Sequence, residues 1–458
     1  MRERENKPLP PLRPTNADQE AWLVYWEEQH QPWRTEPEID AQRQEFLTER
    51  RAIVPDIPAG IYPFREIKLS RADVEWLLAT HKQGRGPIDW SDKDQREREG
   101  LDLRGADLSR VDLHNLPLAR TIADVTWTQY VDLTEEQHLM AALHLEGPDL
   151  KGAHFEGARL EFAHLEGADL RTAHLEQALL GRAFFIGTYL ASAHLEGADL
   201  YSAHLDEAFL WDANLEGAVL RETHLEAARL DRAILANSQG VAARLIDVRW
   251  GDVNLGVVDW SQVKMLGDES IALQLTQDGK VKNNVTRLTE YEWAVRANRQ
   301  LAVVLQDKGL NEISAYFAYR AQLLQREVLW RRRKIGQFLF SGFLDILAGY
   351  GYKPGRSVLA YVLVIATFAL AYAILGHSIH PTISPLGALI FSVTSFHGRG
   401  LFPGGIPLDD PITILAATET VIGLIIEISF IATFTQRFFG KYCLSTKPHR
   451  HLECALPH

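Results

Sequence analysis

The chain is poor in cysteine and in the motifs of catalysis. Its only two cysteines, Cys443 and Cys454, stand near His449 and His451, but their spacing matches no structural zinc motif. No Ser/His/Asp order, phosphate-binding loop or metal-ligand spacing stands out, so we expect no enzyme, no cofactor and no metal centre. The first residues, Met1 to Lys7, are charged and lack an apolar run, which does not fit a signal peptide.

Long apolar runs occur only near the C-terminus. Ser357 to Leu375 holds nineteen residues without a charge, or about 28 Å of helix, close to the ~30 Å of a hydrocarbon core. A second run, Ile412 to Thr435, is interrupted only by Glu419 and Glu427. Between them lie Ser384 to Phe396, too short to span, and the glycine-rich 397–405. This order predicts two spans around a re-entrant loop within 357–436.

The segment resembles the two-transmembrane pore-loop module of the tetrameric potassium-channel superfamily. The counterpart of the filter is Thr394-Ser-Phe-His-Gly-Arg-Gly-Leu-Phe-Pro403, with its glycines displaced by one position. The resemblance implies a homotetramer that conducts permeant ions. The filter residues that it implies are Thr394, Ser395, Phe396, His397, Gly398, Arg399 and Gly400. Because Arg399 lies among the glycines, a ring of carbonyls selective for potassium does not follow.

Three residues of the second run are candidates for the pore lining. Glu419, Gly423 and Glu427 recur every four residues and share one side of a helix. Intramembrane carboxylates normally face a bundle interior or a water-filled cavity. We expect Glu427 to form a ring near the cytosolic entrance, which favours cations, and Glu419 to brace the loop. The alternative for Glu427 is an ion pair with a neighbouring subunit or with the basic segment before the first span.

Charge predicts the orientation in the cell membrane. Basic residues cluster before the first run, at 331–334, 353 and 356, and after the second, at 437, 441, 447 and 450, whereas Arg399 stands beside Asp409 and Asp410 between them. The positive-inside rule then puts both termini in the cytoplasm. Both cysteines fall on that reducing side, which argues against a structural disulfide. Residues 335–350, aromatic with a basic flank, are expected to lie as an interfacial helix against membrane lipid.

A five-residue period dominates the middle of the chain. From Leu145 to Leu235 every fifth residue is Leu or Phe, nineteen positions in all, and between positions 153 and 233 alanine stands two places earlier except at Thr188 and Thr223. The pattern resembles the pentapeptide-repeat family, which implies a right-handed quadrilateral β-helix with Leu or Phe on its axis. The same period occurs at 103–118 and, after a lapse at 236–240, at 245–265. We therefore predict a β-helix over 101–265 with a helical insert near 134–142.

The outward positions of the repeat are also regular. Histidine precedes the central residue at positions 144, 154, 164, 174, 194, 204 and 224, and an acid follows the central residue at 146, 156, 166, 176, 196, 206, 216 and 226. Since twenty residues make one coil, His154, His174 and His194 should stack on one face and His144, His164, His204 and His224 on the opposite one. Such ladders suit divalent metal or a pH response near the histidine pKa of ~6.5. The simpler interpretation is a surface quintet copied by tandem duplication.

The predicted organisation is multidomain. An N-terminal arm and cap (1–100) precedes the β-helix. A cytosolic helical hairpin (286–334), the interfacial helix, an all-α two-span pore-loop domain and a tail (437–458) follow it. We expect a tetrameric, cation-conducting channel whose β-helix binds an unidentified cytosolic protein or ligand. The alternatives are an anion channel of the same fold, a non-conducting membrane-anchored scaffold, and a DNA mimic that inhibits topoisomerase. The net charge of −12 suits the mimic, but the spans count against it, and we expect no nucleic-acid partner.

Overall fold

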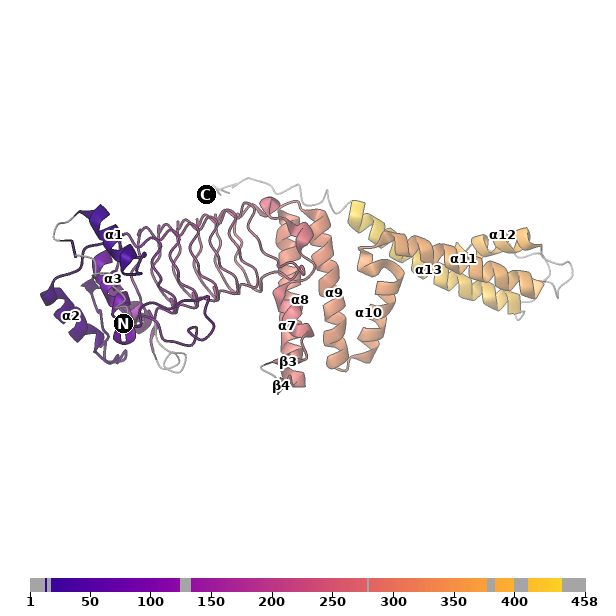
Figure 1. The fold of residues 1–458 in the computed structure, drawn as a ribbon. Coiled ribbons are helices and arrows are strands. Elements are labelled where there is room, and N and C mark those ends of the chain that lie inside the picture. Colours follow the sequence, from indigo (N-terminus) through magenta and orange to yellow (C-terminus); the bar gives the residue numbers. More distant parts are fainter. Residues whose placement is uncertain are drawn as a thin grey trace, which may run out of the picture. The chain divides into compact units, whose positions relative to one another are not determined.

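The computed structural model describes residues 13–14, 18–123, 133–277, 280–376, 384–398 and 411–438. The chain divides into two compact units, residues 1–314 and 315–458. The first unit contains the β-helix with helices at both of its ends (Figure 1). The second contains the long apolar helices.

The predicted β-helix is confirmed. Single parallel bridges join residues twenty positions apart, for example Asp149 to Asp169 and Leu179 to Asp199, and they form the stacked coils of Figure 1. The Leu and Phe residues at the central positions from 145 to 235 are buried, as are the small residues two places before them. Each coil thus has four sides of five residues, and the five-residue period identifies the side chains that point inward.

The corners of the coils need a left-handed backbone. Two residues after the central side chain, φ is positive at position after position, at glycines such as Gly167 (64°) and at other residues such as Thr172 (57°). Glycine adopts this conformation without the steric penalty that a Cβ atom brings. The glycines of the repeat therefore recur because the corner positions need a positive φ, which the five-residue spacing alone does not reveal.

The two exceptions to alanine are explained by hydrogen bonds. Thr188 and Thr223 are fully buried. Their hydroxyls donate to the carbonyl oxygens of Leu165 (2.7 Å) and Leu200 (2.8 Å) in the preceding coil. A buried hydroxyl with a partner costs little, so threonine replaces alanine here without a polar penalty.

Two interruptions change the register. Asp102 pairs with Ile122, but Asp107 pairs with His144, 37 positions further on, because the chain leaves the coil after 123 and returns after α6 (Glu135–Ala141). Later, Val219 pairs with Arg244, 25 positions further on. The five-residue phase survives the lapse at 236–240, as predicted, but the rule of twenty residues per face does not.

A helical cap closes the N-terminal end of the β-helix. It comprises α1 (Gln19–Glu28), α2 (Ala41–Arg51), β1 (Ile67–Lys68), α3 (Arg71–Ala79) and the short α4 (His81–Gly84). β1 pairs in parallel with β2 (Ala106–Asp107) of the first coil, so the cap covers that edge. From residue 18 onward the regular secondary structure of the predicted arm and cap is thus mainly helical, with irregular segments between the helices.

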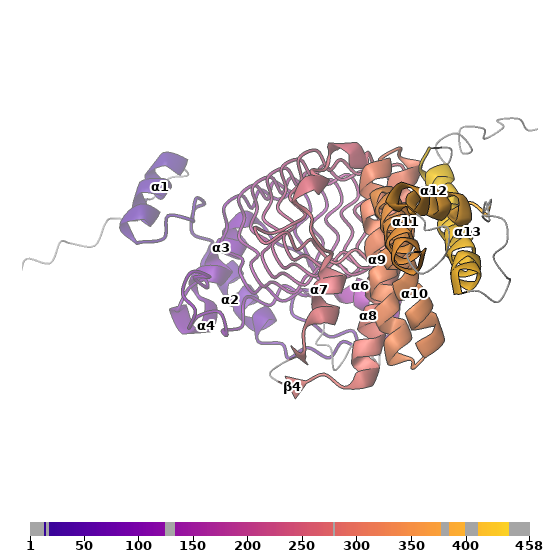
Figure 2. The ribbon, with the colours of Figure 1, turned by 90° about the vertical axis from the view of Figure 1, so that its right-hand side faces the viewer.

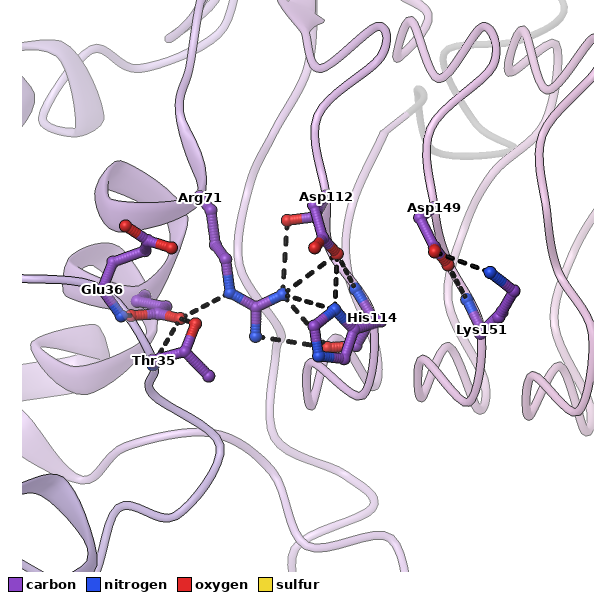
Figure 3. Close-up of polar contacts among 8 residues, drawn as sticks. Thr35, Glu36, Arg71, Asp112, His114, Asp149 and Lys151 are labelled. Atoms are coloured by element: carbon purple, nitrogen blue, oxygen red, sulfur yellow. Dashed lines mark hydrogen bonds and ion pairs between the residues drawn. The ribbon is translucent and has the colours of Figure 1, made fainter. Parts of the chain in front are cut away.

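Arg71 joins this cap to the coils (Figure 3). Its Nε donates to Glu75 at 2.8 Å, and its NH1 lies 3.4 Å from the Asp112 carboxylate and 3.3 Å from the His114 carbonyl oxygen. Glu75 in turn accepts hydrogen bonds from the backbone N–H groups of Thr35 and Glu36. The buried pair therefore ties two parts of the cap region, α3 and the segment at residues 35–36, to the first coil.

The C-terminal end of the β-helix is closed by 3₁₀ turns (Leu255–Val257 and Trp260–Gln262), α7 (Gly267–Leu273), the hairpin β3 (Thr276–Gln277) and β4 (Lys280–Val281), and α8 (Asn284–Asp307). The Asp268 carboxylate accepts from the Leu245 N–H at 2.8 Å, and Asp247 pairs with Arg296 of α8 at 2.8 Å. Met265, predicted at the centre of the last side, is only partly buried; Leu266 is fully buried instead.

The remaining helices are α9 (Asn311–Arg331), α10 (Ile335–Ala348), a 3₁₀ turn (Gly349–Gly351), α11 (Pro354–Gly376), α12 (Pro385–Phe396) and α13 (Pro411–Phe438). Figures 1 and 2 both draw α12 beside α11 and α13, and apolar side chains of all three form common clusters. By length and composition, two stretches suit a membrane span, Gly355–Leu375 and Pro411–Ile431.

Candidate functional site

The short helix α12 lies between the two long ones. It begins with Ser384, whose hydroxyl accepts from the Gly387 N–H, and with Pro385 in its first turn. Its twelve residues are about 18 Å long, too short to cross a bilayer. Phe391 packs near the C-terminal end of α11 and Phe396 near its N-terminal end. α12 therefore runs back along α11, as a re-entrant helix would.

Glu419 ties these three helices together. It is fully buried, and its carboxylate accepts from the Tyr372 hydroxyl of α11 at 2.8 Å and from the Ser392 hydroxyl of α12 at 2.5 Å. The Ser392 hydroxyl also lies 3.0 Å from the Ile365 carbonyl oxygen. This geometry places the Glu419 side chain in the interior of the three helices, and its role as a brace for a pore loop stays a prediction.

Gly423 marks the closest approach of α13 to the end of α12. A Cβ atom there would lie 2.2 Å from the Phe396 carbonyl oxygen, far inside normal contact. One turn earlier, the Thr420 hydroxyl donates to the Ser395 carbonyl oxygen at 2.7 Å. The C-terminal turn of α12 is thus held by hydrogen bonding and by the absence of a side chain.

Glu427 lies beside His397, which follows α12. The Glu427 carboxylate is 3.3 Å from His397 Nε2, and both side chains are about one-third exposed. His397 Nδ1 lies 2.8 Å from the Val393 carbonyl oxygen, so Nδ1 carries a proton, and Nε2 can donate to Glu427 only in the imidazolium form. Within the chain Glu427 thus lies beside the C-terminal end of α12 and pairs with His397, a partner that was not expected. A ring at a cytosolic entrance stays a prediction.

Among the residues predicted to form a filter, the structure describes those up to Gly398, whose φ is 68°. The Thr394 hydroxyl donates to the Phe391 carbonyl oxygen within its own helix at 2.9 Å. The predicted filter residues Arg399 and Gly400, the acids Asp409 and Asp410, and the cysteine and histidine residues of the tail lie outside the described residues.

Asp345 is a junction that the sequence analysis missed. From α10, its carboxylate accepts from the Tyr319 hydroxyl (2.9 Å) and from Arg326 (3.0 Å) of α9, and from Arg356 of α11 (3.0 Å). Asp345 thus links α9 to the start of α11. A lone acid in an apolar, aromatic helix between two basic segments was the available signal.

The histidine ladders form as predicted. His154, His174 and His194 follow one another on one face, and His144, His164, Phe184, His204 and His224 on another. In the first ladder the rings stack with centroids 4.6 and 4.7 Å apart and planes within 1°. The hydrogen bond to Glu156 raises the pKa of His154 despite partial burial, and Glu166 does the same for the pKa of His164. These faces can hold protons or cations.

The comparisons with known proteins concern the β-helix. The family model described as "Pentapeptide repeats" matches residues 143–177, 170–206 and 198–237. Among solved structures, the pentapeptide repeat protein Rfr23 from the cyanobacterium Cyanothece 51142 is 25% identical, with 34% of this chain and 91% of that chain covered and a TM-score of 0.21. QnrB1, a plasmid-mediated fluoroquinolone resistance protein, is 17% identical, with 38% and 94% covered and a TM-score of 0.19.

A third solved structure is HetL from Nostoc sp. strain PCC 7120, a pentapeptide repeat protein involved in heterocyst differentiation regulation. It is 19% identical, with 47% of this chain and 100% of that chain covered and a TM-score of 0.12. TM-scores of this size carry no argument about function. No curated protein matches the chain. The repeat match and the coils agree: residues 143–237 are pentapeptide repeats, and the chain also has two helices long and apolar enough to cross a membrane.

Proposed function

We propose that the protein is a tetrameric pore-loop channel that conducts cations and carries its pentapeptide-repeat β-helix in the cytosol as a regulatory or interaction domain. The observation that carries the proposal is the re-entrant packing of α12 between α11 and α13, fastened by buried Glu419. A buried carboxylate in an apolar bundle is costly and marks a functional position.

The surface of the two long helices supports a lipid environment. Large apolar side chains of α11 are exposed, among them Leu359, Leu363 and Leu370, and so are Val421, Leu424 and Ile428 of α13. Apolar surface of this extent is unusual in water. One pair of spans with one loop cannot enclose an aqueous path, so several copies must surround an axis. The resemblance to the tetrameric potassium-channel superfamily makes that number four.

The cation preference rests on the charge at the C-terminal end of α12. The C-terminus of a helix carries partial negative charge, and Glu427 adds a carboxylate beside it. His397 opposes this when protonated, and Arg399 lies two positions further on in the sequence. These two residues favour the anion-conducting channel as the second candidate, and a reversal potential separates the two.

The test uses the full chain reconstituted into lipid vesicles. We expect native mass spectrometry to show tetramers and asymmetric salt to give a cation-selective reversal potential. Glu427→Gln should lower cation conductance, most at low ionic strength where screening is weak. Glu312→Gln, at an exposed acid of α9, is the control and should leave conductance unchanged. A tetramer that never conducts would leave the membrane-anchored scaffold as the better description.

A further inference from the structure

One face of the β-helix carries an uninterrupted stack of histidines with a glutamate beside each. The Nδ1 atoms of His154, His174 and His194 lie 2.8, 3.0 and 3.3 Å from the Oε1 atoms of Glu156, Glu176 and Glu196, in that order. The backbone beneath is fixed, since the Phe155 N–H donates to the His174 carbonyl oxygen at 2.7 Å. The side chains therefore project from a rigid, evenly spaced support.

The carboxylate of Glu156 is incompletely satisfied. The residue is 5% exposed, its Oε1 meets His154, and its Oε2 is buried without a hydrogen-bond partner among the described residues. Trp90 of the cap stands directly over Gly157, where an added Cβ would meet the indole at 2.7 Å. A buried carboxylate with one free oxygen is costly unless a positive charge or a donor completes it. In the next two coils on this face, Glu176 Oε2 and Glu196 Oε2 are buried in the same condition.

Protonation of histidine does not complete this group. A proton on His154 Nδ1 serves Glu156 Oε1, which already has that contact, and leaves Oε2 as it was. A divalent metal ion can bind carboxylate oxygen and imidazole nitrogen together, and Zn²⁺ is the ion that best suits this mixed set.

The spacing of the ligand atoms fits such an ion. One atom each from His154, Glu156 and His174 lies within 4.8 Å of the others, and the same holds for His174, Glu176 and His194. Tetrahedral zinc with bonds of about 2.1 Å needs ligand atoms roughly 3.4 Å apart, so modest side-chain rotation on the fixed coils would suffice. We propose that this face binds one Zn²⁺-class ion through His154, Glu156 and His174.

The neighbouring positions define where the site ends. Asn214 takes the next place in the ladder and donates to Glu196 Oε1 at 2.6 Å, so that carboxylate oxygen has a second partner. Glu196 belongs to neither group of three. On the other face, Phe184 interrupts the ladder, and partial burial together with the charges of His204 and Arg249 lowers the pKa of His224. Cationic neighbours make that end unfavourable for a metal.

The experiment is a zinc titration of the purified full chain after treatment with a chelator, followed by isothermal calorimetry and by thermal unfolding. We expect His174→Asn to lose one bound Zn²⁺ per chain and the zinc-dependent rise in Tm that goes with it. Asparagine is the residue that the same ladder uses at position 214, so the coil should persist. Glu156→Gln, which keeps the shape of the side chain, should give the same loss.

Glu196→Gln is the matched control, with the same change beyond the site on the same face. It should bind Zn²⁺ like the parent protein. Equal stoichiometry and affinity in the parent, His174→Asn and Glu156→Gln would overturn the proposal. So would an equal loss in Glu196→Gln, since that would indicate nonspecific binding along the face. Should His174→Asn fail to fold, the Glu156→Gln result alone decides.

Discussion

Replacing Gly423 by alanine tests whether the end of the re-entrant helix is seated by direct contact with α13. The new Cβ would lie 2.2 Å from the Phe396 carbonyl oxygen and 3.0 Å from two further Phe396 atoms. A normal contact of about 3.4 Å or more requires a displacement of roughly 1.2 Å. The oxygen belongs to backbone, so the last turn of α12 and His397 after it must move together.

The expected cost follows from comparison with a glycine that has space. At Gly342 of α10 an added Cβ meets nothing within 4 Å. Both substitutions gain about 1 kcal/mol of helix propensity, so their difference isolates the steric term. Overpacking a tight contact costs about 1–3 kcal/mol. We therefore expect Gly423→Ala to be less stable than Gly342→Ala by that amount.

The assay is thermal unfolding of both full-length variants in the same detergent, with conductance measured after reconstitution. Gly342→Ala should unfold at or above the temperature of the parent protein and conduct normally. Gly423→Ala should unfold earlier and conduct differently, because the segment entering the filter is displaced. Equal unfolding temperatures for the two variants would refute the seating of α12 against α13.

Three further outcomes follow from other contacts. Tyr372→Phe removes a donor from the buried Glu419 and should lower the free energy of unfolding by about 1–3 kcal/mol; an unchanged unfolding temperature would mean that the hydroxyl does not matter. Burial raises the pKa of Asp73, but the hydrogen bonds from Arg43 and Ser70 lower this pKa by more, so that it lies below its usual range. A carboxyl whose pKa is lowered by folding stabilises the folded state above its unfolded pKa of ~3.9, and this stabilisation is lost as pH falls through the folded pKa. In urea unfolding, Asp73→Asn should therefore lower the free energy of unfolding at pH 7 and lower it progressively less below pH 4. A difference in unfolding free energy between variant and parent that does not depend on pH would contradict this. Asp345→Asn should cost about 1 kcal/mol, since its arginine partners are partly exposed, and the cost should shrink in high salt.

The β-helix was predictable because its information is periodic. Phe185 and Leu190 are both buried because each occupies the central position of its quintet. That position can be read directly from the sequence. The corner conformation was not predicted, although Gly167 and Gly197 fall at five-residue multiples. Without the backbone, small residues at a corner and small residues in a core look alike.

The contacts between helices were not predictable in the same way. The bond from Tyr319 to Asp345 joins residues 26 positions apart, and no spacing rule connects two helices whose crossing is unknown. The charge pattern identified Glu419 and Glu427 as unusual and placed Glu419 as a brace. The charge pattern did not indicate that Glu427 contacts His397. Which residue of α13 lies beside the end of α12 depends on how the two helices pack, and their composition does not determine that.

The two interruptions of the coils bear on how the chain folds. Where the coils are uninterrupted, each side pairs with the side twenty residues away, a local contact that favours rapid, stepwise propagation. At the excursion after residue 123 the partner is 37 positions away, which adds about 0.5 kcal/mol of loop-closure entropy. The uninterrupted coils between 143 and 235 are therefore where we expect folding to begin, with the first coil and its cap added later across the longer loop.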